Sequence, residues 1–307
     1  MCNAYFTVLN NLKYQVALHL IIFIWGFTAI LGKLIDTDAF VLVWYRVVIA
    51  FISLLLFLFI LRREIKVLDP KKLLALFGVG ILVAMHWLFF YLSIKASTAS
   101  LAIICLSTTT IHVAWLEPIV MRRKPLRAEF ILGAIIVIGI VLITGKVKGE
   151  GVALGVVFGL IAALLAAMFA TFNAKLIQTT SASKITLYEM LSASIVMTIV
   201  LAVIGDLNKA SLSISTNDFL LLLFLGIICT SIAFLATVEI TKYLGAFTVT
   251  LSINMEPIYT LGLAIWMLQE HQELNIYFYI GAAIIVGAVF GNAILKKQAS
   301  RKLRKIR

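Results

Sequence analysis

Runs of about twenty apolar residues recur along this chain, and they limit its fold more than any other feature. An α-helix rises about 1.5 Å per residue, so such a run crosses the roughly 30 Å hydrocarbon core of a bilayer. Of the 307 residues, 63% are hydrophobic and 13% are charged, whereas soluble domains hold about 45–50% and about 25%. We therefore predict an all-α membrane protein with ten transmembrane helices in the lipid bilayer.

The positions of these runs set the predicted spans. The first run is too long for a removable signal peptide, and its downstream flank is poor in a small-residue cleavage site, so we expect it to remain in the mature protein. The predicted spans are Gln15–Ile35, Phe40–Leu61, Leu73–Ile94, Leu101–Met121, Ala128–Thr144, Val152–Ile177, Ile185–Ile204, Phe219–Ile240, Ala246–Leu268 and Ile276–Leu295.

The distribution of basic residues predicts the orientation. A net charge of +12 would suggest a nucleic-acid partner in a soluble chain, but in a membrane protein the position of each Lys and Arg matters more. Most of them flank one set of span ends, in loops 62–72 and 122–127 and in the tail 296–307. Basic residues favour the cytoplasmic side, so we predict that both termini are cytoplasmic. The tail then faces lipid headgroups, and we predict no nucleic-acid partner.

The chain contains an internal repeat. The segment Phe130–Val141 aligns with Phe278–Val289, and Trp44-Tyr45-Arg46 falls against Leu187-Tyr188-Glu189. We predict two five-helix repeats, 15–144 and 152–295, followed by the basic cytoplasmic tail 296–307. Five spans per half is an odd number, so the second half enters the membrane from the opposite face, an arrangement that supports alternating access in secondary transporters. The alternative is a chance similarity between glycine-rich helices.

One ionisable residue lies near the centre of a predicted span. Glu256 is about ten residues, or roughly 15 Å, into the ninth span, which is too deep for its side chain to reach the headgroups. Pro257 removes the helical partner of the Ile253 carbonyl, and Asn254 adds an amide at the same depth. We predict that Glu256, Asn254 and Pro257 form a site for substrate binding or proton coupling. The alternative is a structural kink whose acid pairs with another helix.

Two histidines and several aromatic residues are further candidates. His86 and His112 lie midway along the third and fourth spans, where either could relay protons or bind substrate, or else form an ordinary internal hydrogen bond. Trp87, Tyr91 and Trp115 are candidates for an aromatic cavity wall, although aromatic residues at such positions are more often packing.

Three charged residues are candidate gates. Arg46 and Glu189 occupy matching repeat positions inside opposite faces, where gating and snorkelling to the interface are equally open explanations. Glu117 precedes Pro118 near the cytoplasmic end of the fourth span and fits either a gate or a helix-end anchor.

No motif for enzymatic chemistry is present in the sequence. It contains no HExxH zinc motif and no nucleotide-binding loop, and Cys2, Cys105 and Cys229 are too scattered for a disulfide framework or a metal site. We therefore expect no catalytic residues, no metal and no cofactor. A passive facilitator or channel remains an alternative to a coupled transporter, and an intramembrane enzyme is a weaker one.

Several of these residues together resemble the EamA-type family of the drug/metabolite transporter superfamily over nearly the whole chain. The resemblance is carried by Trp25-Gly26, Lys33, Arg46, Ala246 to Glu256-Pro257, Glu270 and Gly281. The first half departs from the family pattern, since Thr109 stands where the family has Pro and Arg122 where it has Glu, while Gly133 is retained. The resemblance implies an exporter of small organic metabolites, such as amino acids or drugs, in the cytoplasmic (inner) membrane, with protons as a partner in exchange. Whether the protein is a monomer or a homodimer stays open.

Overall fold

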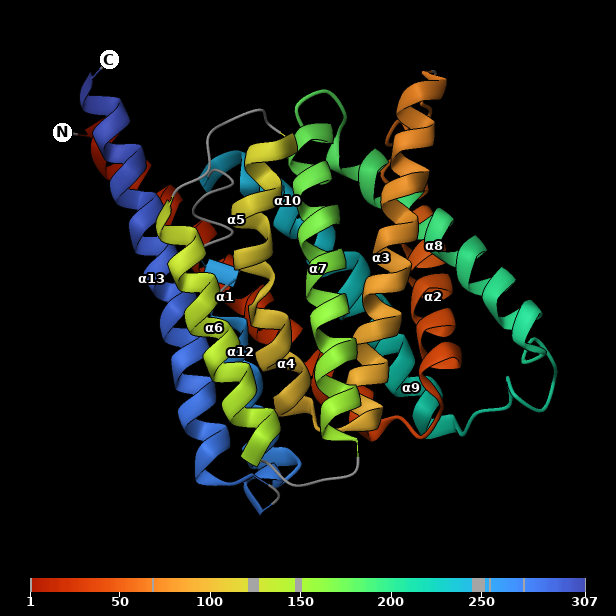
Figure 1. Cartoon of the computed structure of the whole chain (residues 1–307). Helices are drawn as coiled ribbons and strands as arrows, with labels where there is room; N and C mark the ends of the chain where they lie inside the picture. Colours follow the sequence, from red (N-terminus) through yellow and green to blue (C-terminus); the bar gives the residue numbers. More distant parts are fainter. Residues whose placement is uncertain are drawn as a thin grey trace.

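The computed structural model describes residues 2–67, 69–120, 127–146, 151–244, 252–253, 255–272 and 274–306. These residues form a helical bundle without strands, and both chain ends lie at the same end of it (Figure 1). The elements are α1 (Cys2–Leu34), α2 (Ala39–Ile60), α3 (Pro70–Ala96), α4 (Ala99–Ser107), α5 (Thr109–Val120), α6 (Arg127–Lys146), α7 (Val152–Leu176), α8 (Ala182–Ile204), α9 (Thr216–Leu223), the π-helix η1 (Phe224–Ile232), α10 (Ala233–Leu244), α12 (Glu256–Met267), the 3₁₀-helix η2 (Glu270–Gln272) and α13 (Ile276–Ile306).

Short polar side chains set where several helices begin. The carboxylate of Asp38 accepts hydrogen bonds from the first backbone N–H groups of α2, and Asp69 does the same for α3, whose first residue is Pro70. Thr98 caps α4 and Ser215 caps α9. Such caps satisfy the free N–H groups at a helix start, so long apolar helices begin at defined positions between short loops.

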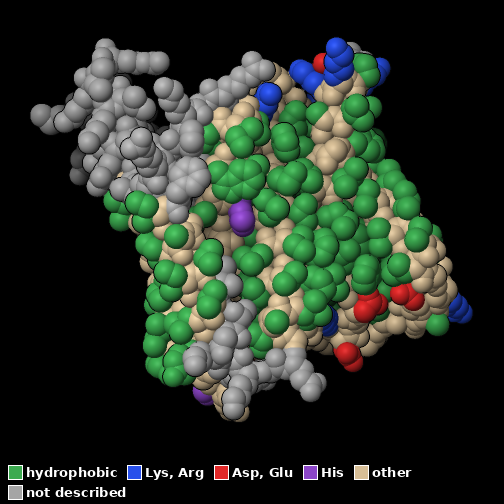
Figure 2. Space-filling view, viewed as in Figure 1, with side chains coloured by type: hydrophobic (Ala, Val, Ile, Leu, Met, Phe, Trp, Pro, Cys, Tyr) green, Lys and Arg blue, Asp and Glu red, His purple; other side chains and the backbone are tan. Residues whose placement is uncertain are grey.

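The composition of these helices fits a bilayer. In the described part of the chain, seven helical segments are long and apolar enough to cross a membrane, and Ile276–Ala288 is a shorter apolar helix. Hydrophobic side chains cover the middle of the visible face, Lys and Arg gather mainly at the end that holds the termini, and most of the visible Asp and Glu lie towards the opposite end (Figure 2). The protein is therefore a multi-pass membrane protein.

Helix packing follows the internal repeat. α6 packs on α13, and α2 packs on α8, so equivalent helices of the two halves pair with each other. Other contacts also occur in equivalent pairs, because η1 and α10 in the second half correspond to α3 in the first. The contact of α3 with α7 corresponds to that of η1 and α10 with α1. The contact of α3 with α8 corresponds to that of η1 with α2. This is the pattern expected when two halves of the same fold are related by a twofold exchange.

Two predicted spans contain breaks that the apolar pattern did not indicate. The fourth span is divided into α4 and α5 at Thr108, where three consecutive hydroxyls, of Ser107, Thr108 and Thr109, each donate to the carbonyl three residues earlier. Such bonds compete with the helical ladder and loosen it. Here hydroxyl groups produce a break at the position where the family pattern has Pro.

The eighth span contains the π-helix η1. The hydroxyls of Thr230 and Ser231 donate to the carbonyls of Leu225 and Gly226, each five residues earlier. A π-turn widens the helix locally, and such turns are frequent at functional sites. This widened segment packs against α2.

Candidate functional site

A buried arginine lies between the two halves. Arg46 on α2 is 3% exposed, and its Nε donates to Thr230 Oγ1 at 3.0 Å while an Nη donates to the Tyr91 hydroxyl at 3.0 Å. Its guanidinium carbon lies 4.0 Å from the centre of the Trp87 ring, a cation–π distance. We call Arg46, Trp87, Tyr91 and Thr230 the arginine site.

Both repeats contribute to the arginine site. Arg46 comes from α2, Trp87 and Tyr91 come from α3, and Thr230 comes from η1 in the second half. The Tyr91 hydroxyl also donates to the Thr28 carbonyl on α1 at 3.3 Å. A movement of η1 relative to α2 and α3 would therefore change the surroundings of the guanidinium directly.

The positive charge of the arginine site has no close anionic partner. Within the described ranges, no carboxylate oxygen lies within the 4.0 Å of an ion pair with Arg46. Glu256, at the start of α12, is half-buried and interacts electrostatically with Arg46 without forming an ion pair with it. Arg46 and Glu256 are thus two opposite charges that share one interior region without direct contact.

The end of the bundle away from the termini is closed by bonds between the halves. Glu270 in η2 is 3% exposed, and its two carboxylate oxygens accept from the backbone N–H groups of Ala99 and Ser100 at 2.8 and 2.9 Å. These are the first N–H groups of α4, where a negative charge is favourable. Asp218 of the second half accepts from the backbone N–H of Asp36 in the first half at 3.0 Å.

Two lysines at this end form bonds within the first half, and two aromatic residues on α2 form bonds to the second half. Lys33 Nζ donates to the Ser97 carbonyl at 2.9 Å, and Lys95 Nζ donates to the Ile35 carbonyl at 2.6 Å. Trp44 donates to Thr198 at 2.9 Å and Tyr45 to the Leu212 carbonyl at 2.7 Å, which ties α2 to the second half.

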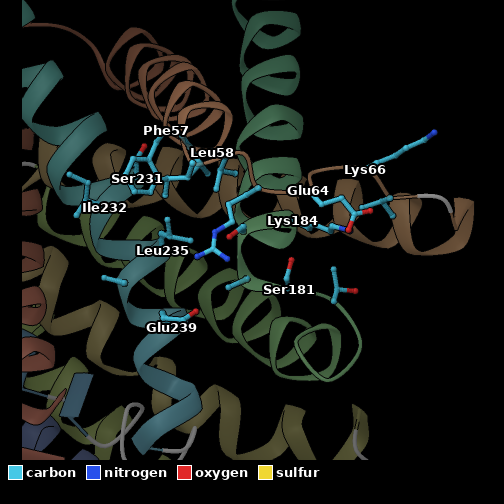
Figure 3. A pocket seen from close by; sticks show the side chains of 18 of the residues that line it. Phe57, Leu58, Glu64, Lys66, Ser181, Lys184, Ser231, Ile232, Leu235 and Glu239 are labelled. Carbon is cyan, nitrogen blue, oxygen red and sulfur yellow. The ribbon is translucent and has the colours of Figure 1, made fainter. Parts of the chain in front are cut away.

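The opposite end, which carries most of the basic residues, contains an open cavity. Its volume is about 990 Å³, and its walls come from α2, the loop after it, the start of α8, η1 and α10 (Figure 3). Lys184 and Glu64, which form an ion pair of 3.2 Å, lie at one side of the cavity in Figure 3. We call this space the open cavity.

The open cavity reaches close to the arginine site. Ser53 and Ser231 are among its lining residues, and their hydroxyl oxygens lie 2.7 Å apart. Ser231 also donates to the carbonyl of Ala50, one helical turn from Arg46, or roughly 6 Å along α2. The lining of the open cavity therefore includes the residue next to Thr230, whose hydroxyl accepts from Arg46.

The other residues predicted from the sequence lie outside the arginine site. His86 is buried with its Nδ1 2.9 Å from the Ala162 carbonyl, which corresponds to the ordinary internal hydrogen bond considered as an alternative. His112 is half-buried on α5 beside Trp115, whose side chain is 40% exposed and does not line the arginine site. Glu117 is half-buried on α5 and Pro257 lies in the first turn of α12, while Asn254 lies outside the described residues.

Glu189 is a second buried charged group, separate from the arginine site. It is 1% exposed on α8, and its carboxyl group is hydrogen-bonded to the side chain of Asn173 on α7. Glu189 Oε1 and Asn173 Oδ1 are both buried without a hydrogen-bond partner. Buried acceptor atoms without donors are unusual in a folded protein, and here they occur on two side chains that are hydrogen-bonded to each other.

Sequence reasoning missed several residues of the closing contacts and of the arginine site. Thr230 gave no signal because a hydroxyl in an apolar run is common, and its role depends on the π-turn. Asp218 could have been found from Ser215, since the two form a reciprocal cap in which Ser215 Oγ accepts from the Asp218 N–H and donates to its carboxylate. Lys95 had no distinguishing signal beyond its place at a span end.

Comparison with known proteins identifies the family. The model of the EamA-like transporter family matches residues 13–145 and 153–294, one match for each repeat. This chain belongs to the EamA-like transporter family. A solved structure titled "Crystal structure of protein" covers 92% of this chain and 97% of its own, with a TM-score of 0.64 and 14% sequence identity, so the two share a fold. No curated protein matches the chain in sequence.

The residues that carry the EamA resemblance connect the two halves. Trp25 Nε1 donates to the Cys229 carbonyl in η1 at 3.1 Å. A side chain at Gly26 would meet Leu263 and Thr260 at 3.3–3.4 Å, so this glycine permits close packing of α12 on α1. Lys33 and Glu270 both bind the turn between α3 and α4. In this EamA-family protein, Trp25, Gly26 and Glu270 therefore connect the two halves, whereas Lys33 bonds within the first half.

Proposed function

We propose that this protein is a secondary transporter that moves a small organic solute out of the cell across the cytoplasmic membrane by alternating access. The observation that carries the proposal is the asymmetry between the ends of the bundle. One end is closed by hydrogen bonds between the halves, whereas the other holds a cavity of about 990 Å³ whose lining includes Ser231, the neighbour of Thr230 in the arginine site. Alternating access requires a central site that is open to one face at a time.

The proposed orientation has ten spans, with the open cavity and both termini on the cytoplasmic side. It is supported by the sequence, in which basic residues gather in the loops 62–72 and 122–127 and in the tail. It is also supported by Figure 2, where the visible Lys and Arg side chains gather mainly at the end that holds the termini. In this orientation the structure represents an inward-facing state, ready to accept a solute from the cytoplasm.

We propose further that transport is coupled to protons through Glu189. Its Oε1 and the neighbouring Asn173 Oδ1 are buried acceptors without donors. A proton on Oε1 would turn this buried acceptor without a donor into a hydrogen-bond donor. Glu256, the carrier expected from the sequence, is half-buried near Arg46, a position that suits contact with the solute as well as proton transfer.

The test is solute-driven proton movement in proteoliposomes that contain a pH-sensitive dye, with a panel of amino acids and drugs. We expect the parent protein to move protons with at least one solute. Glu189→Gln should exchange that solute across the membrane at a normal rate while its proton movement falls at least about 10-fold. Gln keeps the shape of the side chain but cannot bind a proton.

Two results would change this proposal. Solute flux without proton movement in the parent would make the protein a facilitator. Proton coupling that survives in Glu189→Gln and is lost in Glu256→Gln would move the proton site to α12.

A further inference from the structure

We propose that the arginine site binds the carboxylate group of the transported solute, and this inference rests on the transport function proposed above. The ligand class is a small organic acid, and Arg46 is the residue that recognises it. Arg46 supplies the positive charge of the site. Thr230 from the second half, and Trp87 and Tyr91 from the first, hold its guanidinium in place.

The surroundings of Arg46 favour the binding of an anion. Its side chain is 3% exposed in the interior of a membrane protein, where an uncompensated charge is costly. No carboxylate of the described residues lies within 4.0 Å of the guanidinium. The hydroxyls of Thr230 and Tyr91 and the ring of Trp87 stabilise the cation but carry no net negative charge. Glu256 interacts with Arg46 from a distance, and a solute carboxylate would supply an anion in direct contact with the guanidinium.

The geometry leaves donors for such a ligand. A guanidinium has five N–H groups, and the hydrogen bonds of Arg46 to Thr230 and Tyr91 use one on Nε and one on an Nη. The other N–H groups have no hydrogen-bond partner among the residues whose positions are described. Because Thr230 and Tyr91 fix the plane of the guanidinium, the remaining N–H groups keep a constant direction. A fixed pair of N–H groups matches the two oxygens of a carboxylate.

The site is also placed where binding can be linked to movement. Thr230 belongs to the second half, whereas Arg46, Trp87 and Tyr91 belong to the first. A carboxylate bound to Arg46 would compete with the hydrogen bonds that the guanidinium donates to Thr230 in the second half and to Tyr91 in the first. The lining of the open cavity includes Ser231, which follows Thr230 in η1.

Glu256 distinguishes two kinds of organic acid. It lies on α12 within the field of Arg46 but is not ion-paired with it. An acid that also carries an ammonium group could contact Arg46 and Glu256 together, whereas a simple acid would use Arg46 alone. Both share the carboxylate, and the Glu256→Gln variant separates them.

The experiment measures binding by calorimetry and by thermal stabilisation, with the full-length protein in lipid nanodiscs. The probes are leucine and phenylalanine, their desamino analogues isocaproate and hydrocinnamate, and the amide of each of the four. We expect at least one acid to bind and its amide to bind at least about 30-fold more weakly, since the amide leaves the buried charge of Arg46 without an ion-paired partner. Glu256→Gln should weaken the ammonium-bearing acids and leave the simple acids unchanged.

Variants of the arginine site extend the test. Arg46→Gln should lose the binding of every acid, and Arg46→Lys, which keeps the charge but not the paired N–H groups, should weaken binding about 10-fold or more. Thr230→Val should weaken it about 5-fold, the effect of one hydrogen bond. Lys209→Gln, which removes an exposed lysine in the loop between α8 and α9, is the control and should bind as the parent does.

Three outcomes would overturn the carboxylate site: no acid of the panel binds the parent, the amides bind as well as the acids, or folded Arg46→Lys and Thr230→Val bind every acid as tightly as the parent. The transport function is judged separately, by solute-driven proton movement. A parent protein that moves protons with a cationic or neutral solute but binds no acid keeps its transport function and lacks this site.

Discussion

Replacing Glu270 with alanine should lower the free energy of unfolding by about 3–6 kcal/mol, because two hydrogen bonds to a charged group are lost and each contributes about 1.5–3 kcal/mol. The backbone N–H groups of Ala99 and Ser100, which are buried, would be left without acceptors. The negative charge that faces the start of α4 would also disappear. Since Glu270 joins the second half to the first, the closed end should open more often.

Thermal unfolding in detergent measures the stability effect, and cysteine labelling at position 98, in a background without Cys2, Cys105 and Cys229, measures opening. Glu270→Gln should lose less stability than alanine because one oxygen still accepts a backbone N–H. His271→Ala changes the exposed neighbouring residue in η2 and should have almost no effect. Equal stability of Glu270→Ala and His271→Ala would show that this contact does not hold the closed end together.

The sequence predicts the features of this fold that depend on composition along single helices. Apolar runs indicate the spans, and the alignment of Phe130–Val141 with Phe278–Val289 corresponds to α6 and α13, which pack against each other. The breaks within the fourth and eighth spans were missed. They depend on hydroxyls that bond to the carbonyls of their own helix, and the same residues occur in unbroken helices, so composition alone does not distinguish the two cases.

The candidate site was predictable only in part, because a site depends on which helices face each other. Arg46, Trp87 and Tyr91 were all named from the sequence, but as a gate and as cavity walls, and nothing linked the arginine to the two rings. The i+4 spacing of Trp87 and Tyr91 places them on one face of α3, but which helix that face meets depends on packing between the repeats. Thr230 completes the site from a third helix, and its position depends on the π-turn.

The same packing between helices gives the second large prediction, at Gly80 on α3. A Cβ atom at this position would lie 2.5 Å from the Ser192 Cβ and 2.7 Å from the Glu189 carbonyl oxygen on α8. Gly80→Leu should therefore lower the free energy of unfolding by about 3 kcal/mol or more, because the two helices must separate. That separation would also displace the backbone that carries Glu189, so proton coupling should be impaired even in the fraction that folds.

Gly78 provides a matched control two residues earlier on the same helix. It is exposed, and a Cβ atom there would have no neighbour within 4 Å. Gly78→Leu should raise stability by about 0.5–1 kcal/mol, since leucine favours a helix more than glycine does. The two substitutions are chemically identical. If Gly80→Leu lowers and Gly78→Leu raises the stability in a thermal unfolding measurement, the difference comes from the contact between α3 and α8.

A double substitution tests the contact itself. Ser192→Gly removes the Cβ and Oγ atoms that approach Gly80, while the Glu189 carbonyl remains. Gly80→Ala combined with Ser192→Gly should therefore lose less stability than the sum of the two single changes, by about 0.5–3 kcal/mol, as expected for residues in contact. Strict additivity would mean that α3 and α8 do not approach closely at this point. In that case the buried position of Glu189, on which its proposed proton binding depends, would also be wrong.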